Sequence, residues 1–263
     1  PAVTIYNNTA PVQGDTAMSE TNIPLVDLGR QYAAIGGELE SAILEVLRTT
    51  RFVAGPRVAA FEQEFAALHD TEYGVAVNSG TAALHVALWA IGVGPGDEVI
   101  LPVNTYIATA EAVSLCGATP VFVDHNDYFN IDASQIESVI TERTKAVIAV
   151  HLYGQPACMD RIVEICKAKN LVLLEDCAQS HLAEYKGKKT GSFGIAGCFS
   201  FYPGKNLGVI DHILYNTASG AKAADGAIIE LAKPLSDHKP IWAEIVFPRE
   251  LKKVADFQEN IDP

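Results

Sequence analysis

Lys205 is the residue of this sequence whose position most needs a chemical explanation. The segment CFSFYPGKNLG (198–208) places it in a Pro-Gly turn, directly after a run of apolar and aromatic residues. A lysine in such a turn is usually solvated and has no chemical task. The alternative is a lysine held in a pocket, where its amine forms a Schiff base with a carbonyl group. The rest of the chain must decide between the two.

Two further segments place candidate ligand-binding residues at the ends of expected strands. Gly80 and Thr81 follow one strand in NSGTAALHVAL and begin a helix. The free N–H groups and the dipole of a helix start attract an anion such as a phosphate, although Ser79 or Thr81 would also serve as an ordinary helix cap. Tyr106 begins the next helix, where its ring either covers a flat ligand or fills the core.

An acidic residue ends another apolar run. In LVLLEDCAQSH, Asp176 closes the expected strand and Gln179 lies three positions further along. A carboxylate at the end of a buried strand is costly unless it meets a cation, such as a lysine or a protonated ring nitrogen; a helix N-cap is the simpler interpretation. An anion cradle, an aromatic plate, a buried acid and a lysine are together the contacts that pyridoxal 5′-phosphate requires. Each feature alone favours its simpler interpretation, but their joint occurrence predicts a site for this cofactor.

The elements that must position these residues alternate between apolar strands and helices. Strands are expected at 74–78, 98–102, 120–124, 145–154, 171–176 and 198–202, and helices at 38–48, 58–68, 81–91, 105–116, 134–142 and 158–169. This alternation predicts an α/β fold with a mostly parallel or mixed sheet covered by helices. Ligands of such sheets bind beyond the carboxyl ends of the strands, which is where the candidate residues lie.

The two ends of the chain differ from this central part. Residues 1–17 have no hydrophobic periodicity, so we expect a disordered N-terminal segment, followed by a cofactor-binding large domain over 18–208. Residues 209–263 contain only short possible strands at 227–231 and 241–247 and a short possible helix at 249–257. We expect them to form an atypical remnant of a C-terminal region.

Composition excludes several classes of protein. A formal net charge of −13 over 263 residues argues against a nucleic-acid partner. The five cysteines are odd in number and form no C-x-x-C pair, so we expect buried, reduced thiols. No apolar run approaches the roughly 20 residues that span a membrane, and the first segment is too polar for a signal peptide. These features predict a cytoplasmic protein with no membrane partner.

At these motifs the chain resembles the DegT/StrS-type sugar aminotransferases of the aspartate aminotransferase superfamily, which have the large domain of fold type I. The resemblance runs from about residue 22 to residue 208, and the last three of its segments are the most specific. The matching segments are NIPLVDLGRQY, FVAGPRVAAFEQEFA, VNSGTAALHVAL, GPGDEVILPVNTYIATA, GATPVFVD, VHLYGQPACMD, LLEDCAQSH, GKKTGSFG and FSFYPGKNLG.

The resemblance implies a role for each candidate residue. Lys205 would hold the cofactor aldehyde as a Schiff base and carry protons at the substrate carbon, and Asp176 would pair with the pyridinium nitrogen. Gln179 would contact the side of the ring hydroxyl, and Tyr106 would stack on the ring. Three residues would hold the phosphate: Gly80, Thr81 and Ser200.

The resemblance also implies a reaction and a partner. An amino acid, commonly glutamate, would give its amine to the cofactor, and the amine would then pass to a keto group of a nucleotide-linked sugar. Lys205 argues against the related sugar dehydratases, which have histidine at that place. Members of the family form homodimers with the active site at the interface, so a homodimer is expected.

The C-terminal region leaves two hypotheses open. Residues 209–263 are too few for the C-terminal small domain of the family, which is therefore expected to be incomplete. The first hypothesis is a transaminase. The second is a non-catalytic fragment or a cofactor-binding regulatory relative that lacks the substrate-closing domain.

Overall fold

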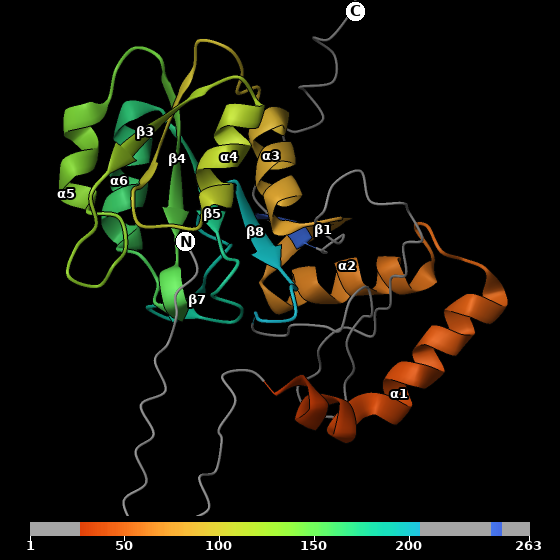
Figure 1. The fold of residues 1–263 in the computed structure, drawn as a ribbon. Helices are drawn as coiled ribbons and strands as arrows, with labels where there is room; N and C mark the ends of the chain where they lie inside the picture. Colours follow the sequence, from red (N-terminus) through yellow and green to blue (C-terminus); the bar gives the residue numbers. More distant parts are fainter. Residues whose placement is uncertain (1–26, 206–242, 249–263) are drawn as a thin grey trace, which may run out of the picture.

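The computed structural model describes residues 27–205 and, by their backbone, residues 243–248 (Figure 1). The expectations for 1–17, 227–231 and 249–257 lie outside the described residues. The division of the chain between 208 and 209 stays a prediction.

Seven of the described strands form one mostly parallel sheet, as the alternation of strands and helices predicts. The strand order in this seven-stranded sheet is β1-β9-β8-β5-β4-β2-β3. Only β9 runs against its two neighbours, β1 and β8. The bounds of these strands are β1 Thr71–Val77, β2 Glu98–Pro102, β3 Thr119–Val123, β4 Thr144–Val150, β5 Val172–Asp176, β8 Ala196–Ser200 and β9 Ala243–Pro248. The expected strand at 241–247 is thus part of the main sheet, as β9.

A small hairpin lies outside this sheet. It pairs β6 (Glu184–Tyr185) with β7 (Lys188–Lys189) in the polar segment YKGKKTGS.

Helices follow the strands closely, with differences at their boundaries. The bounds are α1 Leu28–Thr49, α2 Pro56–Leu68, α3 Gly80–Ala90, α4 Ile107–Leu115, α5 Ala133–Ile136 and α6 Met159–Lys169, with 3₁₀ turns η1 Glu137–Val139 and η2 Leu152–Gly154. The first helix begins ten residues earlier than expected, because the Asp27 carboxylate caps it by accepting the N–H of Arg30. The expected helix at 134–142 is wrong in length: it comprises α5 and a short 3₁₀ turn.

The expected strand at 145–154 also ends early, at Val150. Residues 152–154 form a 3₁₀ turn in which Tyr153 has a positive φ of 55°. The Tyr153 N–H donates to the side-chain oxygen of Gln179 at 2.7 Å. This hydrogen bond to a side chain replaces the pairing with a neighbouring strand that the sequence pattern predicts.

Each face of the sheet has its own core, and the strands contribute to both by alternation. On β5, Leu174 packs in a core with residues of α3 and α4, whereas Leu173 packs in a core with residues of α5 and α6. A third cluster joins α1 and α2 to Phe199, which is on β8, and to Phe201, which follows β8. Helices α3 and α4 lie side by side over the sheet (Figure 1). Alternation therefore decides which helices meet the residues at each strand end.

Candidate active site

The ends of β5 and β8 bring two of the predicted site residues to one edge of the sheet. These strands are parallel, and Asp176 pairs in register with Cys198. Cys198 packs in the α3/α4 core, and Ser200 lies two positions further along the same strand. Asp176 and Ser200 therefore lie on the face of the sheet that α3 and α4 cover.

The start of α3 meets the end of β8 closely enough to need a glycine. A Cβ atom on Gly80 would lie 3.0 Å from the Cβ of Ser200. The Ser79 hydroxyl caps the helix by accepting the N–H of Ala82 at 3.0 Å, so the cap belongs to Ser79 and not to Thr81. Within the described ranges no acceptor lies on the N–H groups of Gly80 and Thr81. These two donors beside the Ser200 hydroxyl suit a bound phosphate.

Asp176 is buried and incompletely neutralised. Its Oδ2 accepts a hydrogen bond from the Thr109 hydroxyl at 2.8 Å, and its Oδ1 accepts the N–H of Ala178 at 3.1 Å. Burial raises the pKa of the Asp176 carboxyl, while these hydrogen bonds and the charge of Lys205 oppose part of that rise. A cation placed against Asp176 would favour its ionised form.

Tyr106 and Lys205 come from different strand ends and meet at this site. The Lys205 ammonium lies 6.0 Å from the centre of the Tyr106 ring. With 67% of its surface exposed, Tyr106 does not fill the core. The Lys205 N–H closes a turn by donating to the Tyr202 carbonyl at 2.8 Å. The ring is therefore available to cover a flat ligand beside the amine.

Asp176 and Lys205 lie close enough for their charges to interact, but they are not joined by an ion pair among the described residues. Both groups therefore stay available to a ligand.

Gln179 is oriented by the backbone. Its Oε1 accepts the Tyr153 N–H, and because a backbone N–H can only donate, the other end of the amide is the NH₂ group. Gln179 thus keeps donors for a ligand oxygen.

Sequence reasoning missed one side chain at this site, Thr109. It is fully buried on α4 and bonds directly to Asp176. The only signal in the sequence was its position three residues after Tyr106, and a threonine with no function could occupy the same position in a helix.

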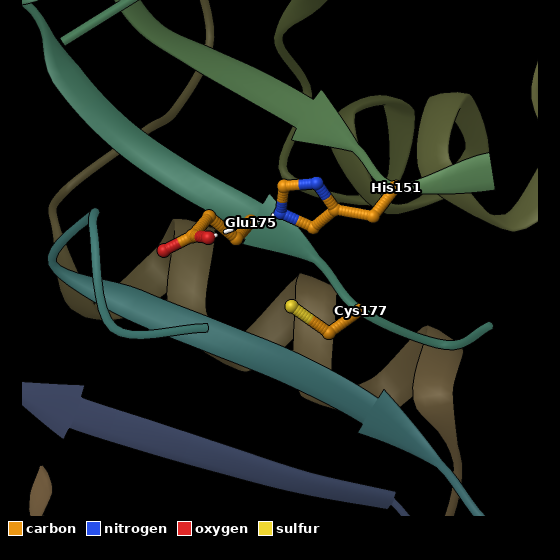
Figure 2. Close-up of side chains that lie close together, drawn as sticks. All are labelled: His151, Glu175 and Cys177. Carbon is orange, nitrogen blue, oxygen red and sulfur yellow. Dashed lines mark hydrogen bonds and ion pairs between the residues drawn. The ribbon is translucent and has the colours of Figure 1, made fainter. Parts of the chain in front are cut away.

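A second cluster of chemically active side chains lies on the opposite face of β5. Figure 2 shows the side chains of His151, Glu175 and Cys177, whose ligand atoms lie within 4.8 Å of one another. The His151 Nε2 lies 3.0 Å from Glu175 Oε2. His151 Nδ1 accepts the N–H of Ala157 at 3.1 Å, so the ring proton is on Nε2 and points at the carboxylate.

The Glu175 carboxylate is already saturated by hydrogen bonds. Besides His151, it accepts the N–H of Gly191 at 2.8 Å, of Phe193 at 2.7 Å and of Gly194 at 2.8 Å. Burial raises the pKa of the Cys177 thiol well above its usual value, so the thiol stays protonated. Because the carboxylate is occupied by four donors and the thiol is protonated, we interpret the cluster as a structural clamp on the loop at 191–194.

The five cysteines are all free, as expected, but they are not all buried. Cys166, Cys177 and Cys198 are buried and Cys116 is half-buried, whereas Cys158 is exposed. The expectation of burial is wrong for Cys158 because it precedes α6 at the surface. Burial raises the pKa of Cys166 to about 12.

The lysines of the small hairpin have partners. Lys186 pairs with Asp160, Lys189 pairs with Asp70, and Lys188 lies over the ring of Phe193.

Among the described helices, none is both long and apolar enough to cross a membrane.

Comparison with known proteins gives the same family as the motifs. Residues 33–212 match the model of the DegT/DnrJ/EryC1/StrS aminotransferase family. One relative is the dTDP-3-amino-3,4,6-trideoxy-alpha-D-glucose transaminase of Streptomyces venezuelae, 48% identical over 187 residues, which are 71% of this chain and 49% of the relative. Another, the pleiotropic regulatory protein of Geobacillus stearothermophilus, is 46% identical over 71% of this chain and 50% of its own length.

Solved structures agree with these relatives. S. venezuelae DesV in complex with a ketimine intermediate superposes with a TM-score of 0.74 at 39% identity, covering 89% of this chain and 55% of that one. Bacillus subtilis ntda, with bound cofactor PMP, gives a TM-score of 0.69 at 29% identity over 90% of this chain and 47% of that one. The chain spans about half the length of the curated relatives it matches.

Proposed function

Because this chain belongs to the DegT/DnrJ/EryC1/StrS aminotransferase family, we propose that it supplies the cofactor-binding half of a sugar aminotransferase. The cofactor is pyridoxal 5′-phosphate, the amine donor is an amino acid such as glutamate, and the acceptor is a keto group on a nucleotide-linked sugar. The observation that carries the proposal is the convergence of Lys205 on the Tyr106 ring beside the buried Asp176. A second copy of the chain is the proposed partner.

The proposed chemistry divides between the cofactor and the chain. When bound, pyridoxal 5′-phosphate supplies an electron sink for carbon–hydrogen bond cleavage beside the transferred amine. Lys205 Nζ takes and returns the proton at that carbon. Asp176 holds the proton on the ring nitrogen, because a buried carboxylate is stabilised by an adjacent positive charge.

The remaining candidate residues orient the cofactor. The N–H groups of Gly80 and Thr81 and the hydroxyl of Ser200 bind the phosphate at the start of α3. The exposed ring of Tyr106 covers one face of the cofactor and excludes water there. The amide NH₂ of Gln179 donates to the ring oxygen.

One observation favours a second candidate function. A relative of similar identity is named as a regulatory protein, and this chain spans about half the length of such relatives. A chain that holds the cofactor without completing the substrate site would bind pyridoxal phosphate and perform no turnover.

The experiment that tests the proposal combines absorbance with chemical trapping. We expect the purified chain mixed with pyridoxal 5′-phosphate to develop visible absorbance, and borohydride to fix about one cofactor per chain on Lys205, located by mass spectrometry of peptides. Lys205→Ala should abolish fixation. The matched control Lys188→Ala, in the exposed hairpin, should retain it. A wild-type chain that stays colourless, or carries the label elsewhere, would contradict the proposal.

Adding glutamate to the loaded chain then separates the two candidate functions. Loss of the visible band with formation of the pyridoxamine form indicates a transaminase. A band that persists in excess glutamate indicates the non-catalytic alternative.

A further inference from the structure

A chain of two hydroxyl groups leads from the loop before α4 to Asp176. The Thr109 Oγ1 lies 2.8 Å from Asp176 Oδ2 and 2.8 Å from the Thr105 Oγ1. Thr109 is fully buried and Thr105 is half-buried.

The direction of these hydrogen bonds follows from the number of protons. A hydroxyl has one proton to donate, and an ionised carboxylate can only accept. When Asp176 is ionised, the Thr109 hydroxyl must therefore donate its proton to Oδ2. In the contact between the two hydroxyls, Thr105 is then the donor and Thr109 the acceptor. Both hydroxyl protons then point toward the acid.

The hydrogen-bond partner of Thr109 is unusual for a hydroxyl on a helix. On the same helix, Ser114 donates to the carbonyl of Ala110, four residues earlier, at 3.2 Å. Such local bonds are the usual fate of helical hydroxyls. Thr109 instead reaches across to the end of β5.

The relay also connects the acid with the residue proposed to cover the ring. Thr105 directly precedes Tyr106, the N-cap residue of α4. The carboxylate of Asp176 is held on one oxygen by its own strand-end loop, through Ala178, and on the other by α4. A rotation of the carboxylate would break one of these bonds.

From this geometry we propose that Thr109, supported by Thr105, is a positioning residue that holds Asp176 as an oriented hydrogen-bond acceptor toward the cofactor ring. The inference rests on the proposed function, because it assigns Asp176 to the ring nitrogen. Thr109 acts through Asp176 and does not itself touch the cofactor.

The first test measures the affinity of the full chain for pyridoxal 5′-phosphate by absorbance titration. Thr109→Val keeps the shape and removes the hydroxyl, and we expect about tenfold weaker binding, the size of one hydrogen bond to a charged group. Thr109→Ser should rescue binding to within about threefold. Binding by Thr109→Val within twofold of wild type would overturn the proposal.

A matched control removes a buried hydroxyl elsewhere. The Thr71 hydroxyl is buried and donates to the Ala66 carbonyl at 3.0 Å, away from Asp176. Thr71→Val should leave cofactor affinity unchanged. An equal loss of affinity in this variant would mean that the effect is general destabilisation, and would overturn the positioning role.

The second test uses the cofactor-free chain, so it does not depend on the proposed function. Urea unfolding is measured for Thr109→Val in the wild-type and in the Asp176→Ala background, with Asp176→Asn as the background if Asp176→Ala does not fold. We expect the fold-change in the unfolding constant to be several times larger when Asp176 is present. Equal fold-changes in both backgrounds would overturn the relay, whereas failure of the wild type to bind cofactor alone would overturn only the proposed function.

Discussion

Glu175 and Asp176 are neighbours on β5, yet their carboxylates face different sides of the sheet. Glu175 is fully buried and accepts three backbone N–H groups and the His151 ring proton. Asp176 accepts one hydroxyl and one backbone N–H. The Glu175 carboxylate has its hydrogen-bond acceptors filled by the protein, whereas the Asp176 carboxylate can still accept hydrogen bonds from a ligand.

This difference distinguishes a structural acid from a candidate functional acid better than burial does. Both carboxylates are buried, and both lie at the carboxyl end of β5. A saturated carboxylate stabilises the loop that it holds, whereas one with remaining capacity to accept has reason to meet a cation. The two residues therefore predict different consequences when they are changed.

The largest expected effect comes from removing the saturated acid. Glu175→Ala leaves three backbone N–H groups and His151 without their acceptor, and we expect a loss of about 3–5 kcal/mol in the free energy of unfolding. Urea denaturation followed by circular dichroism measures it, with the exposed Glu184→Ala as control. A loss below about 1 kcal/mol would mean that water replaces the clamp and that the two acids do not differ.

A change of the second acid should affect the cofactor more than the fold. Asp176→Asn keeps the size of the side chain and removes its charge, so we expect affinity for pyridoxal 5′-phosphate to fall about 10- to 100-fold. The free energy of unfolding without cofactor should change by less than about 2 kcal/mol. If Asp176→Asn instead unfolds the chain as Glu175→Ala does and leaves affinity intact, the functional assignment is wrong.

The third prediction concerns how the free energy of unfolding depends on pH, through two histidines on the same side of the sheet as Glu175. His69 and His181 lie among the rings of Phe65 and Phe199. Burial lowers the pKa of His69 to about 4 and that of His181 to about 3. Both rings are therefore neutral in the folded chain.

The sign of the pH effect follows from these lowered values. Near neutral pH both histidines are neutral in either state. As the pH falls below about 6.5, only the unfolded chain takes up their protons, so stability is lost progressively toward pH 4 and pH 3. Replacing His181 with Phe should make the free energy of unfolding fall less steeply, by up to about 1.4 kcal/mol per pH unit.

Unfolding measured between pH 7 and pH 4 checks this prediction. Exposed His125, changed to Gln, should keep the wild-type slope. A His181→Phe chain that is as acid-sensitive as the wild type would contradict this prediction and place the acid lability at other groups.

Much of the fold was predictable because strand and helix periods are local properties. The parallel strands lie where the apolar runs are, and Asp176 and Ser200 meet because alternation puts both on one face. The turn at Tyr153 was not predictable, since the hydrogen bond from its N–H goes to Gln179, which is distant in the chain. The early start of α1 depended on a single cap, Asp27, which periodicity does not report.

The residues of the candidate site could be selected from the sequence, but their function is not thereby tested. Residue type and position at strand ends selected the acid, the lysine, the exposed ring and the helix start, but their roles toward a cofactor stay predictions. Thr109 was missed because a helical hydroxyl has no distinctive local pattern. His151 had no assigned role, and its bond to Glu175 joins two neighbouring strands.

By itself, the sequence determined which residue types stand at the ends of the strands, because hydrophobic period and motif spacing are written along the chain. Only the tertiary structure decided which of the two adjacent carboxylates has all its hydrogen-bond acceptors filled by the protein. The number of donors around a buried oxygen depends on segments far apart in the sequence, here the loop at 191–194 for Glu175 and the start of α4 for Asp176.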